Sequence, residues 1–122
     1  EGNKIFNNNV DIIFWNSSIE HNKINDIKRA VNVSMKSLKK GGLFLATWAI
    51  GEHTHWNESA KATILSPMDA CKVFGIEWVS PPSYQKIVKA YKSNILGLNT
   101  WHKKRFNTNE YDFVHAGCMI IK

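Results

Sequence analysis

The sequence has few of the features that mark secreted and membrane proteins. Only two cysteines, Cys71 and Cys118, occur among its 122 residues, and both lie in apolar stretches. Two thiols cannot build the disulfide framework of a small secreted domain, and neither has an adjacent base that would make it a nucleophile. No apolar run approaches the roughly 18 residues of a membrane-spanning helix, and the polar start of the chain does not resemble a secretory signal. We therefore expect a cytoplasmic protein that does not enter a membrane.

Acidic residues are also scarce relative to basic ones. The chain carries 16 Lys and Arg against 10 Asp and Glu, which gives a net charge of +6. Such a charge favours anionic partners such as nucleic acid, nucleotides or acidic surfaces, although many basic domains of this size bind none. Hydrophobic residues make up 43% of the chain, so it is globular and not disordered. Its length indicates one domain with a core of its own.

Two short apolar runs flank a helical pattern near the start of the chain. Residues 10–15 read VDIIFW and residues 43–50 read LFLATWAI, and such unbroken runs are typical of strands covered on both faces in a parallel sheet. Between them, apolar residues spaced three and four apart predict a helix over residues 23–39. We expect Gly41 and Gly42 to end this helix with a left-handed cap. The order strand, helix, strand predicts a crossover between two parallel neighbours.

The second half of the chain also mixes helix and strand signals. A Ser-Pro pair has the residue types of an N-cap and a first helical position, which predicts a helix over residues 67–74. An amphipathic pattern predicts another helix over residues 84–96, and residues 76–79 fit a short strand. The chain ends in an apolar run that predicts a final strand over residues 111–121. Together these patterns indicate the α/β class.

Two segments resemble the middle of class I S-adenosylmethionine-dependent methyltransferases. They are VDIIFWNSSIEH, residues 10–21, and SLKKGGLFLATW, residues 37–48. In that family a polar residue ends the fourth strand at the cofactor, and a short segment often ending in Glu-His follows. A helix and a glycine-glycine turn then lead into the fifth strand; here Lys40 replaces the usual proline of that turn. The resemblance implies a partial Rossmann-like methyltransferase sheet, with the two apolar runs as parallel strands and the strand near residues 111–121 antiparallel.

The family's glycine-rich cofactor loop has no counterpart in this sequence. In the family that loop follows the first strand, whereas the resemblance here begins just before the fourth, and no G-x-G-x-G pattern occurs. The chain therefore resembles the C-terminal half of a methyltransferase domain. Without the first strand beside it, the run at residues 10–15 becomes an apolar sheet edge that invites pairing, and one face of the sheet lacks helices. We expect a fragment of a longer chain or a homo-oligomer.

Three polar residues follow the first apolar run. Asn16, Ser17 and Ser18 would lie at the carboxyl end of a parallel strand, where open α/β sheets bind ligands. The resemblance implies contact with S-adenosylmethionine, and a simple turn with a helix cap is the alternative. His21, which follows Glu20, could accept a proton from the acceptor's nucleophile; the alternative is a structural histidine that shapes the pocket.

A polar, aromatic stretch follows the second apolar run. We interpret Glu52 and His53 as catalytic candidates, and Trp48, His55 and Trp56 as walls of an acceptor pocket. The alternative is a solvated loop. The two histidines with a nearby carboxylate have the residue types of a metal pair, but no third ligand stands at a diagnostic spacing. We therefore expect no metal.

Cations and aromatic residues alternate in WHKKRF, residues 101–106. Such a loop could grip phosphates and stack a base. The alternative is a solvated basic loop anchored by its aromatic residues.

The resemblance favours methyl transfer from S-adenosylmethionine to an oxygen or nitrogen nucleophile of an acceptor that the sequence does not identify. A non-catalytic α/β interaction module is one alternative. A basic nucleic-acid-binding module is the other.

Overall fold

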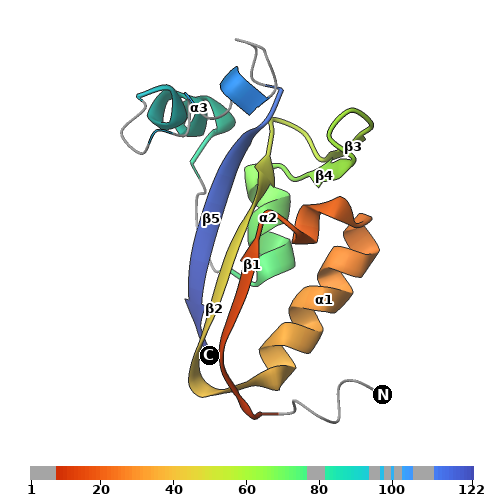
Figure 1. Cartoon of the computed structure of the whole chain (residues 1–122), viewed down its shortest axis with the longest axis vertical. Coiled ribbons are helices and arrows are strands. Elements are labelled where there is room, and N and C mark those ends of the chain that lie inside the picture. The colour runs from red at the N-terminus through yellow and green to blue at the C-terminus, as the bar shows by residue number, and fades with distance from the viewer. Residues whose placement is uncertain (1–7, 77–81, 94–96, 98–99, 101–102, 106–111) are drawn as a thin grey trace.

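The computed structural model describes residues 8–76, 82–93, 97, 100, 103–105 and 112–122. Its strands and helices follow one another along the chain from β1 to β5 (Figure 1). In chain order they are β1 (Val10–Asn16), the 3-10 helix η2 (Ile19–His21), α1 (Ile24–Ser37), β2 (Leu38–Ile50), β3 (His55–Asn57), β4 (Ala62–Ile64), α2 (Pro67–Phe74), α3 (Tyr84–Lys92) and β5 (Val114–Ile121).

The main sheet has three strands in the order β1-β2-β5. β1 runs parallel to β2, with Trp15 opposite Ala46, and β5 runs antiparallel to β2, with Cys118 opposite that same alanine. The strand, helix, strand order at the start of the chain therefore forms the predicted crossover, and the predicted antiparallel direction of the last strand is confirmed. The fold class is α/β with a mixed sheet.

The core lies on one face of this sheet. Alternate residues of β2, from Phe44 to Ile50, are buried there, and α1, α2 and α3 all contribute side chains to the same cluster. Phe74 of α2 packs against Trp48 with ring centroids 4.2 Å apart and against Phe44 at 6.2 Å. Burial of such side chains stabilises a fold by roughly 1.5–3 kcal/mol each.

The opposite face of the sheet is apolar and exposed. Ile12 and Phe14 of β1 are 57% and 63% exposed, and Met119 and Ile121 of β5 are 63% and 65% exposed. The strand register aligns these residues across β2, because Ile12 is opposite Leu43, which in turn is opposite Ile121. For the described residues this confirms the expectation of a sheet with one face free of helices (Figure 1).

The glycine pair near the end of α1 was wrongly predicted to cap that helix. The helix ends at Ser37, and both glycines lie within β2, which begins at Leu38. Gly41 has a φ of 80° and donates its N–H to the carbonyl of Lys122, while a Cβ on Gly42 would lie 2.9 Å from the carbonyl oxygen of Lys39. These glycines are therefore required by the bend of β2 beside its neighbouring strands. They are not required by the end of α1.

The other predicted boundaries agree with the structure to within a few residues. The helix at 67–74 is confirmed: Ser66 Oγ accepts a hydrogen bond from the backbone N–H of Asp69, and Gly75 closes the helix with a φ of 65°. The helix predicted over 84–96 ends at Lys92, and residues 94–96 lie outside the described residues, as do most of the possible strand at 76–79 and the first residue of the predicted last strand. The small β3–β4 sheet was not predicted.

Candidate functional site

The end of β1 is fixed by a threonine of the neighbouring strand. The backbone N–H of Ser17 donates to the carbonyl oxygen of Thr47 at 3.2 Å and to its Oγ1 at 2.9 Å, and Thr47 Oγ1 donates to Asn16 Oδ1 at 3.0 Å. Ser17 has a φ of 47°, a conformation that a non-glycine residue adopts at a cost. Asn16 and Ser17, two of the three residues predicted to contact a cofactor, are therefore held in place by Thr47. The sequence analysis did not identify Thr47.

A cavity of about 260 Å³ lies at the carboxyl ends of β1 and β2. It is bordered by the segment after β1, the end of β2, the β3–β4 turn and the start of β5. The described side chains that line it are Ser17, Glu20, His21, Ala49, Ser59, Ala60, Ala62, Arg105, Phe113 and His115. The structure thus brings together Ser17, His21 and the glutamate between them, three residues of the segment that the sequence analysis singled out.

Glu20 is the most buried charged residue at this cavity. It is 2% exposed, and its Oε2 has no hydrogen-bond partner in the described part of the chain. Burial raises the pKa of its carboxyl above the usual value, while a hydrogen bond to its own backbone and the charge of His21 oppose that rise. A buried carboxylate with an unused acceptor is suited to bind a hydrogen-bond donor or a cation, or to exchange a proton.

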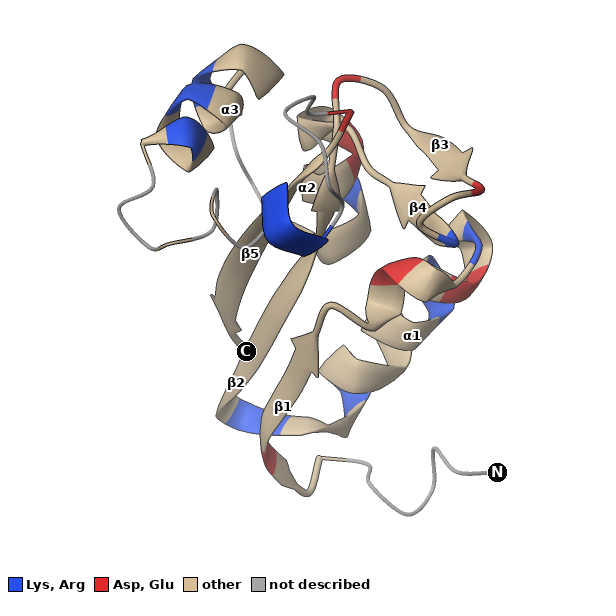
Figure 2. Ribbon diagram, turned by 45° about the horizontal axis from the view of Figure 1, so that its top comes forward, with Lys and Arg blue, Asp and Glu red and all other residues tan. Residues whose placement is uncertain are grey.

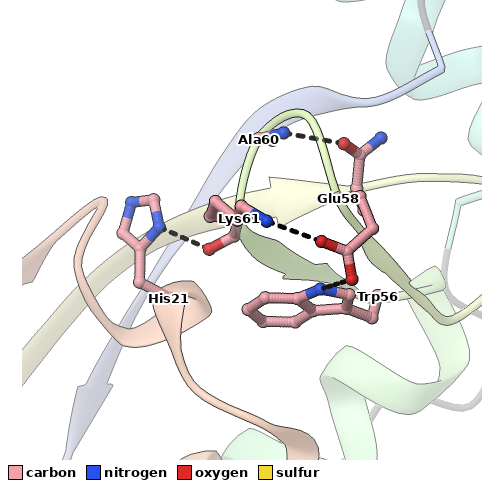
Figure 3. Close-up of polar contacts among 6 residues, drawn as sticks. His21, Trp56, Glu58, Ala60 and Lys61 are labelled. Carbon is pink, nitrogen blue, oxygen red and sulfur yellow. Dashed lines mark hydrogen bonds and ion pairs between the residues drawn. The ribbon is translucent and has the colours of Figure 1, made fainter.

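His21 is oriented by the β3–β4 turn, as Figure 3 shows. Its Nδ1 lies 2.8 Å from the carbonyl oxygen of Lys61. Because a carbonyl oxygen only accepts, Nδ1 carries the proton, and in the neutral ring Nε2 holds the lone pair. The geometry therefore leaves Nε2 as the nitrogen that can accept a proton.

The turn that orients His21 has its own polar scaffold (Figure 3). The Glu58 carboxylate accepts hydrogen bonds from Lys61 Nζ at 2.7 Å and from Trp56 Nε1 at 2.9 Å, and these bonds lower the pKa of Glu58. Lys23 Nζ lies 3.5 Å from the centroid of the Trp56 ring, a cation–π contact. Trp56, predicted as a wall of the acceptor pocket, is half-buried in this scaffold and does not border the cavity.

The remaining predicted site residues lie elsewhere. Ser18 is exposed and makes no side-chain cap to η2. Glu52 and His53 are exposed on the loop after β2; Glu52 Oε1 accepts a bond from Gln85 Nε2 at 3.2 Å, and the His53 carbonyl accepts one from His55 Nδ1 at 2.9 Å. The structure does not bring Glu52, His53 or His55 to the cavity that His21 lines.

Trp48 is 3% exposed and belongs to the core. It borders a separate apolar cavity of about 200 Å³ beside α2 and β5, which Cys71 and Cys118 also line. Burial raises the pKa of both thiols, that of Cys118 to about 11, so both thiols are protonated at neutral pH.

Two common kinds of functional feature are absent from the described residues. No group of three or more His, Cys, Asp or Glu side chains could hold a metal ion there. No helix of this part of the chain is long and apolar enough to cross a membrane. In the basic loop predicted over 101–106, Lys103, Lys104 and Arg105 are helical and exposed, and the other residues lie outside the described part.

No family model matches the chain, and no curated protein sequence does either. Among solved structures it is similar to Phospholethanolamine N-methyltransferase 2 from Haemonchus contortus, in complex with phosphomonomethylethanolamine and S-adenosylhomocysteine, with a TM-score of 0.59 and 14% identity. It is also similar to the [4+2]-cyclase SpnF, with a TM-score of 0.57 and 12% identity.

The chain is short compared with these proteins. The similarity covers 96% and 95% of this chain, but only 34% of the methyltransferase and 50% of the cyclase. At such low identity the comparisons show the fold alone. The chain has a mixed α/β fold that resembles part of each of these two structures.

Proposed function

We propose that the chain forms part of an S-adenosylmethionine-dependent methyltransferase that acts on an oxygen or nitrogen nucleophile, within a longer chain or an assembly. The observation that carries this proposal is the cavity at the carboxyl ends of β1 and β2. Open α/β sheets bind their ligands at this edge. Ser17, Glu20 and His21 reach the cavity from the segment that resembles the family at its cofactor edge.

The cavity is compatible with part of the methyl donor. Its volume of about 260 Å³ lies just below the roughly 300–1,000 Å³ of sites that enclose a whole drug-sized ligand. The unused oxygen of Glu20 could accept a bond from an amino group of the donor or of the acceptor. We infer that Asn16 and Ser17 lie toward the donor, and that other walls of the site come from outside the described residues.

The chemistry required of this chain is limited. The bound donor supplies a methyl group that is already activated, so the protein has to position the acceptor and remove its proton where necessary. His21 Nε2 is the proton acceptor in this proposal, because the Lys61 carbonyl holds the proton of the ring on Nδ1. The carboxylate of Glu20 would stabilise the imidazolium that forms, since the two residues interact electrostatically.

The bare face of the sheet supports an assembly. From the strand spacing, the exposed apolar face of the three-stranded sheet, which includes Ile12 and Ile121, has an area on the order of 300 Å². A standard interface buries about 800 Å² on each partner. A homodimer through this face alone would therefore be weak. We propose that a layer of amphipathic helices covers it, which is easiest to supply from the same longer chain.

Binding of the donor tests the proposal. Calorimetry of the chain with S-adenosylmethionine should give a dissociation constant below about 1 mM, which corresponds to about 4 kcal/mol. Ser17→Tyr should abolish the binding by filling the cavity, whereas Lys36→Gln, on the exposed side of α1, should leave it unchanged. Absence of binding at millimolar donor, with the protein folded by circular dichroism, would refute a donor site on this chain.

A non-catalytic α/β interaction module is the second candidate. The exposed apolar face favours it, because contiguous apolar surface on a soluble domain often marks an interaction site. This candidate predicts that the chain associates with a partner but does not bind the methyl donor. The same calorimetry therefore separates the two.

A further inference from the structure

The net charge of the chain comes from one segment. Residues 78–109 contain six Lys and Arg and no Asp or Glu, whereas the rest of the chain contains ten of each sign. The whole net charge of +6 therefore lies in this segment. Such segregation is a mark of proteins that bind polyanions, because an even mixture of charges would not produce a directed field.

The structure places these cations at one end of the molecule, and we call this region the basic surface. α3 exposes Lys86, Lys89 and Lys92, while Ile87 and Val88 on its other side pack against the core. The exposed residues 103–105 lie at the same end of the molecule as α3 (Figures 1 and 2). The basic surface consists of Lys86, Lys89, Lys92, Lys103, Lys104 and Arg105.

Acidic groups meet the beginning of α3. The Glu52 carboxylate accepts a hydrogen bond from Gln85, and both Glu52 and Asp112 act electrostatically on Tyr84. They add to the effect of burial in raising the pKa of that tyrosine to about 12.

The basic surface leads to the cavity of the candidate site. Arg105 belongs to both, since it also lines that cavity. Phe113 and His115 line it too, with ring centroids 6.1 Å apart in an edge-to-face arrangement. A chain of phosphates on the basic surface would thus bring one of its bases to a cavity with an aromatic wall, and aromatic rings are common stacking partners of unpaired bases.

We propose that the basic surface binds single-stranded nucleic acid. A lipid bilayer fits less well, because the apolar side of α3 is used in the core and no large exposed apolar residue of the described chain lies on this helix. A flat bilayer also could not follow the surface to Arg105 at the cavity. This inference does not depend on methyl transfer, since it requires no methyl donor.

Binding to a fluorescein-labelled 20-residue oligouridylate, followed by anisotropy between 50 and 200 mM KCl, tests the proposal. Each phosphate contact with a single strand contributes about 0.7 to the slope of log affinity against log salt. With six cations engaged the slope is about −4, which corresponds to a loss of roughly 250-fold in affinity over this range. The titration contains no S-adenosylmethionine, so failure here leaves the donor-binding test unaffected.

Two triple variants locate the contact. Lys86→Gln with Lys89→Gln and Lys92→Gln should reduce the slope by about 2, and the same change at Lys103, Lys104 and Arg105 should do likewise. A matched control removes three exposed cations of α1 and the same net charge. The control consists of Lys28→Gln, Arg29→Gln and Lys36→Gln.

The outcomes are distinct. Binding with the predicted slope, weakened by either surface triple and not by the α1 triple, supports the proposal, provided that circular dichroism shows each variant folded. No binding at 50 mM KCl would overturn it, as would equal losses in the control. Binding to phosphatidylserine vesicles without binding to the oligonucleotide would also overturn it, in favour of a membrane surface.

Discussion

Replacing Glu20 by glutamine should stabilise the protein at neutral pH, although Glu20 lines the candidate site. The carboxylate is 2% exposed and one of its oxygens has no hydrogen-bond partner within the described chain. A buried acceptor without a partner costs about 1–3 kcal/mol, and a charged one costs more. Glutamine has nearly the same shape and also leaves one polar atom without a partner, but it carries no charge, so Glu20→Gln should raise the free energy of unfolding at pH 8 by about 1 kcal/mol.

The gain should depend on pH in a defined direction. Burial raises the folded-state pKa of Glu20 above its usual 4.5, so the folded protein holds this proton more tightly than the unfolded chain does. The stabilisation that Glu20 contributes by binding this proton is fully present below its unfolded-state pKa. It is lost as the pH rises through its folded-state pKa. Glutamine resembles the protonated form, so the advantage of Glu20→Gln should be large at pH 8 and absent near pH 4.

Urea unfolding at several pH values measures this difference, and Glu58→Gln is a matched control. Hydrogen bonds from Lys61 and Trp56 lower the pKa of the exposed Glu58 carboxyl, so its contribution is present above the unfolded pKa and lost as the pH falls. The control should therefore lose stability at pH 8, opposite in sign to Glu20→Gln. If Glu20→Gln proved less stable than the parent at pH 8, the carboxylate would have a stabilising partner and the reasoning would fail.

Three further substitutions, with Ser18→Ala as a control for the first, test the local structure through urea unfolding. Ser66→Ala removes the side-chain cap of α2 and should cost about 1 kcal/mol, whereas Ser18→Ala, where no cap bond exists, should change little; equal effects would contradict the assignment. Gly75→Ala places a Cβ at a φ of 65° and should cost about 1–2 kcal/mol, so an unchanged midpoint would argue against a left-handed cap. Phe44→Ala empties a fully buried position and should cost about 3–5 kcal/mol; a loss below 1 kcal/mol would place Phe44 outside the core.

The elements that the sequence predicted well are those with local signals of their own. β1 is a dense apolar run, and α2 starts with a serine cap and ends at a glycine. The parallel direction of β1 and β2 was predicted from the length of the crossover between them. The antiparallel direction of β5 was predicted from the resemblance to methyltransferases. Each of these signals depends on residues that are close in sequence, so a single chain is sufficient to detect them.

The parts that were missed depend on contacts between distant segments. β3 and β4 have three residues each, too few to show a period. Thr47 acts on Ser17 only because the register places Asn16 opposite it, which no local pattern specifies. Trp48 and Trp56 were both predicted to line the acceptor pocket. The alternation of side chains along β2 places Trp48 in the core, and the β3–β4 hairpin places Trp56 beside Lys23.

The fold of this chain is compatible with more than one kind of reaction. One structural neighbour is named a methyltransferase and the other a cyclase, so the same sheet supports different reactions, as common folds do. At the carboxyl ends of its parallel strands this chain carries a buried carboxylate, a histidine whose Nε2 can accept a proton, and an arginine shared with the basic surface. Because these groups meet in one cavity, substitutions at Glu20, His21 and Arg105 should separate donor binding, proton transfer and polyanion binding from one another.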